Sequence, residues 1–218
     1  MLMPDLSFEI VGAHPVRDTI TPVLAFDLRL TNAFPEQAIQ AVLLRCQVQI
    51  EAARRRYSSV EQNRLRELFD EPARWGDTLR PLTWANTSVN IPAFSGATIY
   101  PITVACTFDL NVGTTKYFYG IAGGEIPLTF LFSGSIFYHS PDGALQVCPI
   151  CWNKEARFRL PADVWQSAMD LHHPNAAYLS LRRDAFDDLC QFKASKGFST
   201  FEEAIRQMLA AAEREIPA

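Results

Sequence analysis

Apolar and polar side chains alternate with a period of two along the first fifty residues. Apolar residues occupy every second position in residues 24–30 and again in residues 42–50, and most of the intervening positions are charged or polar. Because successive side chains of a strand point to opposite faces, this period predicts strands with one buried and one solvated face. The turn-like residues 32–36 separate the two segments, which is typical of an antiparallel sheet.

A short helix is predicted between strands, near residues 58–71. Ser58 and Glu61 have the spacing of a capping box, and the apolar residues of the segment Leu65–Phe69 follow at helical spacing. The pattern therefore changes from a strand period to a helix period and indicates a helical insertion in a β-rich region.

The stretch around this helix is rich in arginine, and acidic residues nearly balance it. The arginines are Arg54, Arg55, Arg56, Arg64, Arg66, Arg74 and Arg80, and the acids are Glu51, Glu61, Glu67, Asp70, Glu71 and Asp77. Surface ion pairs of this kind are common and individually weak. The balance favours a solvated, salt-bridged segment over a patch that binds phosphate or an acidic partner.

Residues 81–153 are poor in charge but contain 12 of the 25 aromatic residues. The charged residues are Asp109, Lys116, Glu125 and Asp142. Alternation predicts strands at 100–112 and 128–138, and the second of these has apolar residues on both faces, as a central or doubly covered strand does. Ser140–Gly143 has the proline and glycine of a type I turn, which predicts a hairpin with residues 145–152.

The last sixty residues change to a helical pattern. Helices are predicted from Pro161, over about residues 184–194, and after a second capping box at Ser199–Glu202. The apolar stripe of the last helix is expected to be buried; it consists of Phe201, Ala204, Ile205, Met208, Leu209 and Ala212.

Strands followed by helices predict an α+β fold: mainly antiparallel, β-sandwich-like sheets with an inserted short helix and C-terminal helices. We expect a β-rich domain at residues 1–160, with its helical insertion near 58–71, and a helical segment at 161–218 that packs on it.

Composition narrows the class of protein. The chain has 218 residues, 48% hydrophobic residues and a net charge of -4. This content argues against disorder, and the negative charge argues against nucleic-acid binding through a broad basic surface. With neither a secretory signal nor an apolar stretch long enough to span a bilayer, we expect a soluble, cytoplasmic protein that does not bind membranes. Five cysteines fit a reducing compartment.

The motif best suited to a chemical role is Cys148-Pro149-Ile150-Cys151, because two thiolates at this spacing can hold a metal or exchange a disulfide. A four-ligand site needs two more ligands, and a hairpin would place the nearest histidine, His139, beside Leu145 and about 10 Å along the strand from Cys148. In an extended strand the two cysteines also face opposite ways. The sequence therefore favours two small apolar residues of a strand over a metal or redox pair.

Two other groups could support acid–base or metal chemistry. His172-His173 precedes a proline at a predicted helix end, where a histidine interacts favourably with the helix dipole. Asp109 and Glu125 lie in the charge-poor region, where a carboxylate pair could have raised pKa values. In both cases a structural or solvated role is the favoured interpretation. Because the chain also lacks a G-x-S-x-G motif, we expect no catalytic residue, cofactor-binding residue or metal ligand.

The depletion of charge in residues 81–153 indicates a covered surface, because the cores of protein interfaces are poor in charge and rich in aromatic residues. Two kinds of cover remain open at this point. The C-terminal helices could pack on one sheet face, or another chain could cover part of the region.

Several short sequence segments spread along the chain carry a family resemblance. They are Ile39–Glu51, Arg56-Tyr57, Leu68-Phe69, Arg74-Trp75, Cys106–Asp109, Gly124–Leu128, Phe132–Gly134, Leu160-Pro161 and Trp165. Over nearly its full length the chain resembles an uncharacterised bacterial family, a domain of unknown function associated with gene clusters of nickel-iron uptake hydrogenases. The resemblance implies an accessory or assembly role and brings no known activity, cofactor or catalytic residue.

Two hypotheses follow. The first, which we favour, is a non-enzymatic protein-interaction or assembly accessory protein, and the resemblance implies a nickel-iron hydrogenase as its client. The expected partner is another protein or a second copy of the chain, and no cofactor is expected. The alternative is a small metal- or redox-active protein that uses Cys148 and Cys151.

Overall fold

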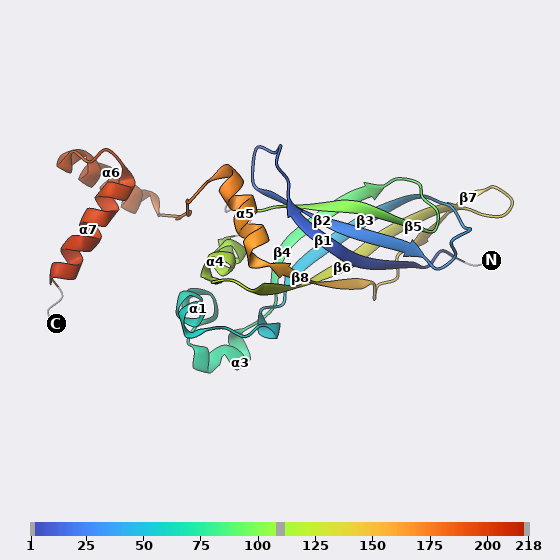
Figure 1. The fold of residues 1–218 in the computed structure, drawn as a ribbon, viewed down its shortest axis with the longest axis horizontal. Coiled ribbons are helices and arrows are strands. Elements are labelled where there is room, and N and C mark those ends of the chain that lie inside the picture. Colours follow the sequence, from blue (N-terminus) through green and yellow to red (C-terminus); the bar gives the residue numbers. More distant parts are fainter. Residues whose placement is uncertain (1–2, 108–111, 216–218) are drawn as a thin grey trace. The chain divides into compact units, whose positions relative to one another are not determined.

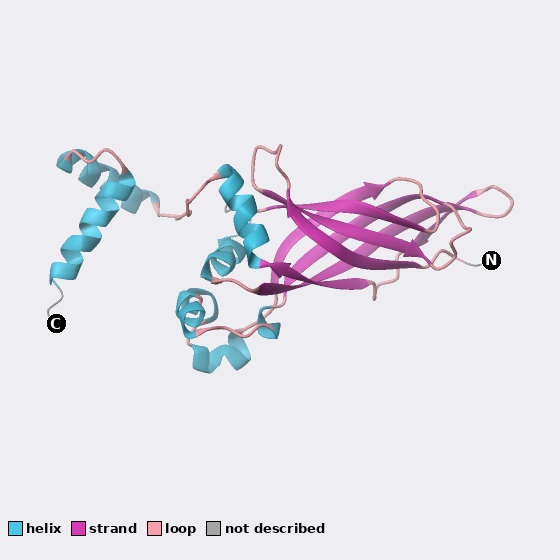
Figure 2. Cartoon of the chain, viewed as in Figure 1, coloured by secondary structure: helices cyan, strands magenta, loops and turns pink. Residues whose placement is uncertain are grey.

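The computed structural model describes residues 3–107 and 112–215, and these form two compact units. The first unit extends to Ala176 and the second begins at Ala177. The first unit is an antiparallel β-sandwich with helices gathered at one end of its strands (Figures 1 and 2). The fold class predicted from the sequence, α+β with antiparallel sheets and C-terminal helices, is confirmed.

The described residues contain eight strands in two sheets. The three-stranded sheet has the order β1-β2-β5, and the five-stranded sheet has the order β4-β3-β6-β7, with β8 also paired to β6. The strands are β1 (Leu6–Pro15), β2 (Val23–Asn32), β3 (Ile39–Ile50), β4 (Leu82–Ile91), β5 (Ala97–Ala105), β6 (Glu125–His139), β7 (Leu145–Pro149) and β8 (Glu155–Pro161). Strand β6 is long enough to pair with β8 along its first half and with β7 along its second.

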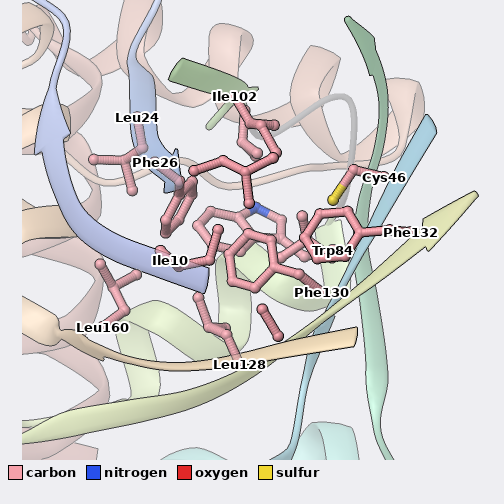
Figure 3. Packing of buried hydrophobic residues seen from close by; sticks show 14 of the residues in the cluster. Ile10, Leu24, Phe26, Cys46, Trp84, Ile102, Leu128, Phe130, Phe132 and Leu160 are labelled. Carbon is pink, nitrogen blue, oxygen red and sulfur yellow. The ribbon is translucent and has the colours of Figure 1, made fainter. Parts of the chain in front are cut away.

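The core lies between the two sheets, where the inward-facing apolar residues meet. Phe26 of β2 packs edge-on against Phe130 of β6 with ring centroids 5.0 Å apart (Figure 3). Phe8 of β1 stacks on Phe132 of β6, with ring centroids 4.6 Å apart. The alternation predicted for residues 24–30 and 42–50 is therefore the core face of the two sheets.

Glycine is required at one position where the sheet is tightest. Gly134 of β6 has φ +140°, and a Cβ there would lie 1.9 Å from the carbonyl oxygen of Leu43. A side chain cannot fit so close to the neighbouring strand, so this glycine permits β3 and β6 to approach.

The predicted hairpin is confirmed, but its second strand ends at Pro149 and not at residue 152. Strand β7 returns beside β6 after the turn Ser140–Gly143, His139 pairs with Leu145, and Gly143 has φ +83°. Strand β6 is central, as its two apolar faces indicated.

The helices of the first unit lie at the same end of the sandwich in Figure 1. They are η1 (Ala52–Arg54), α1 (Ser59–Arg64), α2 (Arg66–Phe69), η2 (Pro72–Arg74), α3 (Trp75–Thr78), α4 (Val112–Gly120) and α5 (Ala162–His172). The capping box of Ser58 and Glu61 begins α1, as predicted. Helix α5 contacts β1, β2 and β8, so it belongs to the first unit, which extends to Ala176.

One predicted strand is too long. The sequence pattern placed a strand over residues 100–112, whereas β5 ends at Ala105 and Val112 begins α4. Helix α4 lacks a clear amphipathic period because buried residues are spread around most of it, among them Thr114, Thr115 and Tyr117. Threonine and aromatic residues also favour strands, so local propensity pointed away from the helix that tertiary packing stabilises.

The second unit consists of α6 (Arg183–Lys196) and α7 (Phe201–Glu215). The capping residue of α7 is Thr200, whose hydroxyl accepts from the Glu203 backbone, so the predicted capping box is shifted by one residue. Phe186 and Phe201 pack together across the two helices, with ring centroids 5.6 Å apart. Ala204 of the predicted apolar stripe is buried, but Met208 and Leu209 keep 47% and 59% exposure, so the stripe is covered only in part. That the stripe packs on another surface stays a prediction.

Candidate functional site

The two sheets leave five strands with a free edge: β1 and β5 in one sheet, and β4, β7 and β8 in the other. An edge strand presents backbone N–H and C=O groups that can pair with a strand of another chain. Natural proteins block such edges with charge, proline, a bulge or a short strand. The five edges can therefore be compared by asking which of them is blocked.

Four of the edges carry a blocking feature. Strand β1 has a bulge at Ile10–Gly12, and β5 has Pro101 at its centre. Strand β8 carries the charged residues Glu155, Arg157 and Arg159 at alternate positions. Strand β7 has only 5 residues and ends in a proline. Each feature disfavours pairing with a further strand.

Strand β4 is different, because its regular part carries none of these features. A bulge at Trp84 interrupts its pairing with β3, and the pairing is then regular from Ala85 to Ile91. We refer to residues Ala85–Ile91 as the β4 edge. It contains no charged residue and no proline. Its side chains alternate between the core and solvent, and the exposed ones are Asn86, Ser88 and Asn90.

The charge-free character extends to the neighbouring strand on the same side of the sandwich. Residues 81–107, which include all of β4 and β5, contain no Asp, Glu, Lys or Arg. Strands β4 and β5 belong to different sheets and approach each other at this side. A cavity of about 550 Å³ lies between them, lined by residues that include Asn86, Thr103 and Trp165. The charge-poor region of the sequence thus maps partly onto one open side of the fold.

The aromatic part of that region has an internal cover. Phe130 and Phe132 are 0% and 2% exposed, because they face the core between the sheets. Their cover is the opposite sheet, through Phe26 and Phe8, and not the C-terminal helices that the sequence suggested. Burial between the sheets therefore explains why β6 is aromatic and poor in charge. It does not explain why the edge strand β4 lacks charge.

The two cysteines of the C-x-x-C motif line one cavity of about 390 Å³ between β1 and β7. Strand β7 ends at Pro149, so the expectation that both cysteines stand on opposite faces of one strand is wrong. Cys148 is buried, and burial raises the pKa of its thiol, whereas Cys151 is exposed. The other lining residues are mainly apolar, such as Phe8 and Ile136. A buried thiol with a raised pKa is a poor nucleophile and a poor metal ligand.

One histidine of the His172-His173 pair has a structural role. His172 is the last residue of α5, and its Nε2 atom lies 2.7 Å from the carbonyl oxygen of Thr19 in the loop between β1 and β2. The contact ties the end of α5 to that loop. Asp109 lies outside the described residues, and Glu125 forms an exposed ion pair with Arg159.

Most charged residues of the arginine-rich segment form exposed ion pairs, as expected, but one pair is buried. Arg55 and Glu61 have side chains that are 11% and 6% exposed, and their closest atoms lie 2.8 Å apart. The Arg55 guanidinium also donates to the carbonyl oxygens of Gly123 and Glu125. This pair joins the start of α1 to the loop that precedes β6.

Glu61 is held in its charged form by several donors. It accepts hydrogen bonds from Arg55 and from the backbone N–H groups of Ser58 and Ala122. Burial by itself would raise the pKa of Glu61, but these donors together lower it to about 2. Beside the pair, the hydroxyl of Tyr57 lies 2.8 Å from that of Tyr117, and burial raises the pKa of both phenols. We refer to Arg55, Tyr57, Glu61 and Tyr117 as the Arg55–Glu61 network.

The sequence pattern did not single out this network. Glu61 was expected as a helix cap, and Arg55 was grouped with solvated arginines. The partners in the loop at residues 122–125 lie more than sixty positions away in the chain, and no local spacing reports such a contact. Apart from the buried Nη1 atom of Arg55, which has no hydrogen-bond partner among the described residues, the groups of the network that form hydrogen bonds pair within the same unit, so the network serves the fold.

Among residues 3–107 and 112–215, no three or more His, Cys, Asp or Glu side chains gather in a way that could hold a metal ion. Within the same described ranges no helix has the length and apolar character to cross a membrane.

Fold and site together define a β-sandwich protein with a helical end and one unblocked sheet edge. The sequence model described as "Family of unknown function (DUF6084)" matches residues 3–217, so the chain belongs to that family. No curated protein matches the chain.

Solved structures show only a remote likeness. One is the CARDB domain of the PF1109 protein from Pyrococcus furiosus, described in complex with di-metal ions (10% identity, TM-score 0.28, covering 72% of this chain and 92% of that one). Another is the putative ApaA protein from Bordetella pertussis (14% identity, TM-score 0.27, 72% and 93%). A third is the sporulation control protein Spo0M from Bacillus subtilis (12% identity, TM-score 0.28, 73% and 49%). These values are too low to carry a functional argument.

Proposed function

We propose that this protein is a non-enzymatic interaction protein that associates with a polypeptide strand through the β4 edge. The observation that carries the proposal is the length of the β4 edge: seven regularly paired residues have neither charge nor proline, more than in any such stretch of the other four free edges of the described sheets. Main-chain hydrogen bonds supply the affinity when a strand is added to such an edge.

The chemistry of the edge specifies what kind of ligand fits. The backbone groups of Ala85–Ile91 call for the backbone of an extended segment, and Asn86, Ser88 and Asn90 offer neutral hydrogen-bonding side chains beside it. A small-molecule substrate or a charged polymer would not use this row of groups. The β4 edge therefore favours a protein ligand, in agreement with the interaction hypothesis drawn from the sequence.

The second unit supports the same class of function. Residues 177–215 expose several large apolar side chains, which this unit leaves uncovered; they include Leu179, Phe186, Met208 and Leu209. Several exposed large apolar side chains on one small helical unit are consistent with a contact region. An accessory protein that assembles through its sandwich and contacts a client through its helices would use both features.

The family resemblance adds a proposal about the client. It implies a nickel-iron hydrogenase, for which this protein would be an assembly accessory in the cytoplasm of a bacterium. Deletion of the chain from a cell that makes such a hydrogenase is the test: we expect less mature enzyme, and unchanged maturation would remove the hydrogenase from the proposal while leaving the β4 edge untouched.

Site-specific cross-linking tests the edge directly. Asn86 is replaced by the photo-reactive residue p-benzoylphenylalanine in cells that express the chain, and a matched control carries the same residue in place of the exposed Arg157 on the blocked β8 edge. We expect a covalent product with a polypeptide from position 86 and none from position 157. If position 86, like the control position 157, gives no product, the β4 edge does not bind a protein chain and the proposal is wrong.

A further inference from the structure

We infer that the strand added at the β4 edge is β4 of a second copy of this chain, paired antiparallel about a two-fold axis at Ser88. This inference rests on the proposed function and names its partner. It makes the five-stranded sheets of two copies into one continuous sheet across the axis.

The side chains of the β4 edge read the same in both directions. The exposed residues are Asn86, Ser88 and Asn90, so an antiparallel copy centred on Ser88 presents the same sequence, asparagine, serine, asparagine. In this register Asn86 lies opposite Asn90 of the partner subunit, and Ser88 lies opposite Ser88 of the partner subunit. Neutral hydrogen-bonding side chains therefore face each other along the whole exposed row.

The regular length of the strand selects this register. The bulge at Trp84 limits the strand on one side and Pro92 limits it on the other, and Ser88 is the midpoint of the stretch between them. A copy centred on Thr87 would bring Asn90 opposite the bulge at Trp84. A copy centred on Val89 would place Pro92, which has no N–H group, against Asn86. Only the register centred on Ser88 pairs all of Ala85–Ile91.

Electrostatics permit a copy to meet itself at this edge. A two-fold axis brings like residues together, so a charged residue near the axis would be repelled by its own copy. The nearest charge on the exposed row is Arg45 of β3, which pairs with Ser88. Two copies of Arg45 would be three strand spacings apart, about 14 Å, and physiological salt largely screens exposed charges at that separation.

The symmetric pairing also explains why an unblocked edge is tolerated. An antiparallel two-fold contact uses the same surface on both copies and closes on itself, so it ends at a dimer. The four remaining free edges are blocked by charge, proline, a bulge or shortness. The dimer therefore has no open edge left for further growth.

A charge-exchange experiment tests the axis. Because Ser88 meets itself, Ser88→Lys and Ser88→Glu are each expected to weaken dimerisation about tenfold or more by like-charge contact. An equimolar mixture of the two variants is expected to form dimers again, since lysine then lies opposite glutamate. Sedimentation velocity from about 1 to 100 μM measures all three samples, because a contact of seven paired residues is small and a dissociation constant on the order of micromolar is expected. The matched control is the same pair of substitutions at exposed Ser7 on β1, which should leave dimerisation unchanged.

The outcomes separate this inference from the proposed function. Dimeric wild type, weakened single variants and recovery in the mixture support pairing at Ser88. Wild type that is monomeric at 100 μM overturns the second-copy inference, and so does a dimer that both variants leave intact. A cross-link from position 86 to a different protein would then retain the proposed function with another partner, and no cross-link at all would remove both.

Discussion

The Arg55–Glu61 network and the β4 edge treat polar groups in opposite ways. In the network, buried charges from different segments meet, and Glu61 alone accepts from Arg55, Ser58 and Ala122. At the β4 edge there is no charge, and the outer side of the strand pairs with no other strand of the described chain. Apart from Nη1 of Arg55, the hydrogen-bonding groups of the network pair within the fold, whereas the outer backbone groups of the β4 edge pair with no described strand.

This difference shows that buried charge in the network contributes to stability, whereas the absence of charge at the β4 edge concerns association with another chain. A buried ion pair is costly to break, because the remaining partner stays desolvated and uncompensated. An edge without charge is tolerated only if pairing with another chain is intended or controlled. Substitutions in the two regions should therefore separate stability from association, and the expected effects differ in size.

The largest effect is expected for the network. Glu61→Gln leaves the Arg55 guanidinium buried without its carboxylate, and breaking a buried pair in this way costs about 3–5 kcal/mol of the free energy of unfolding. Chemical denaturation measures the change. The matched control is Glu202→Gln in the exposed pair with Arg206, which should change stability by at most about 0.5 kcal/mol. A loss below about 1 kcal/mol in Glu61→Gln would show that the pair does not hold the fold.

A second effect of the network is a dependence of stability on pH. The pKa of Glu61 is about 2 in the folded chain and 4.5 as its ordinary value, so its contribution is complete above about pH 4.5 and is lost as the pH falls towards 2. The shift corresponds to about 3 kcal/mol at most. Denaturation at a series of pH values in this window should show a smaller acid-induced loss for Glu61→Gln than for the wild type. Equal losses would assign acid sensitivity to other carboxylates.

How far the sequence predicted each region follows from the range of the interactions. Alternation in residues 24–30 and 42–50 identified the core face correctly, because burial of one strand face produces a two-residue period in the local sequence. The charge-poor stretch also pointed to a covered surface. Which of its strands would be an edge could not be predicted, because strand order depends on pairings between residues far apart in the chain.

Helix α4 and the Arg55–Glu61 network were missed for a related reason. Buried residues are spread around most of helix α4, so it lacks the broad polar face that gives a helical period. The partners of Arg55 lie in the loop before β6, and only the folded chain brings them together. The sequence could suggest that Glu61 caps a helix, but not that it also neutralises a buried arginine.

A smaller effect on stability is expected at the β4 edge. Asn86→Lys with Asn90→Lys adds two charges to exposed positions, and surface substitutions of this kind usually change the free energy of unfolding by less than about 0.5 kcal/mol. Lysine on an edge strand nevertheless disfavours pairing with another strand. We therefore expect a stable monomer in sedimentation, in contrast to the destabilised Glu61→Gln variant. A large loss of stability would mean that these asparagines serve the fold, and the contrast between the two regions would fail.

The smallest effect is expected at the cysteine cavity, which lies outside both regions. A metal bound by Cys148 and Cys151 would give the protein a chemical site and revive the alternative function. The structure disfavours it, because burial raises the pKa of the Cys148 thiol and the described residues supply no cluster of three or more ligand side chains. Cys148→Ser with Cys151→Ser should therefore leave the metal content of protein purified without chelator unchanged, as measured by elemental analysis. The matched control is the buried Cys46, whose thiol pKa burial raises to about 12, and Cys46→Ser should give the same metal content. Stoichiometric zinc or iron that the double variant alone loses would instead make the cavity the functional centre and reduce the β4 edge to a secondary feature.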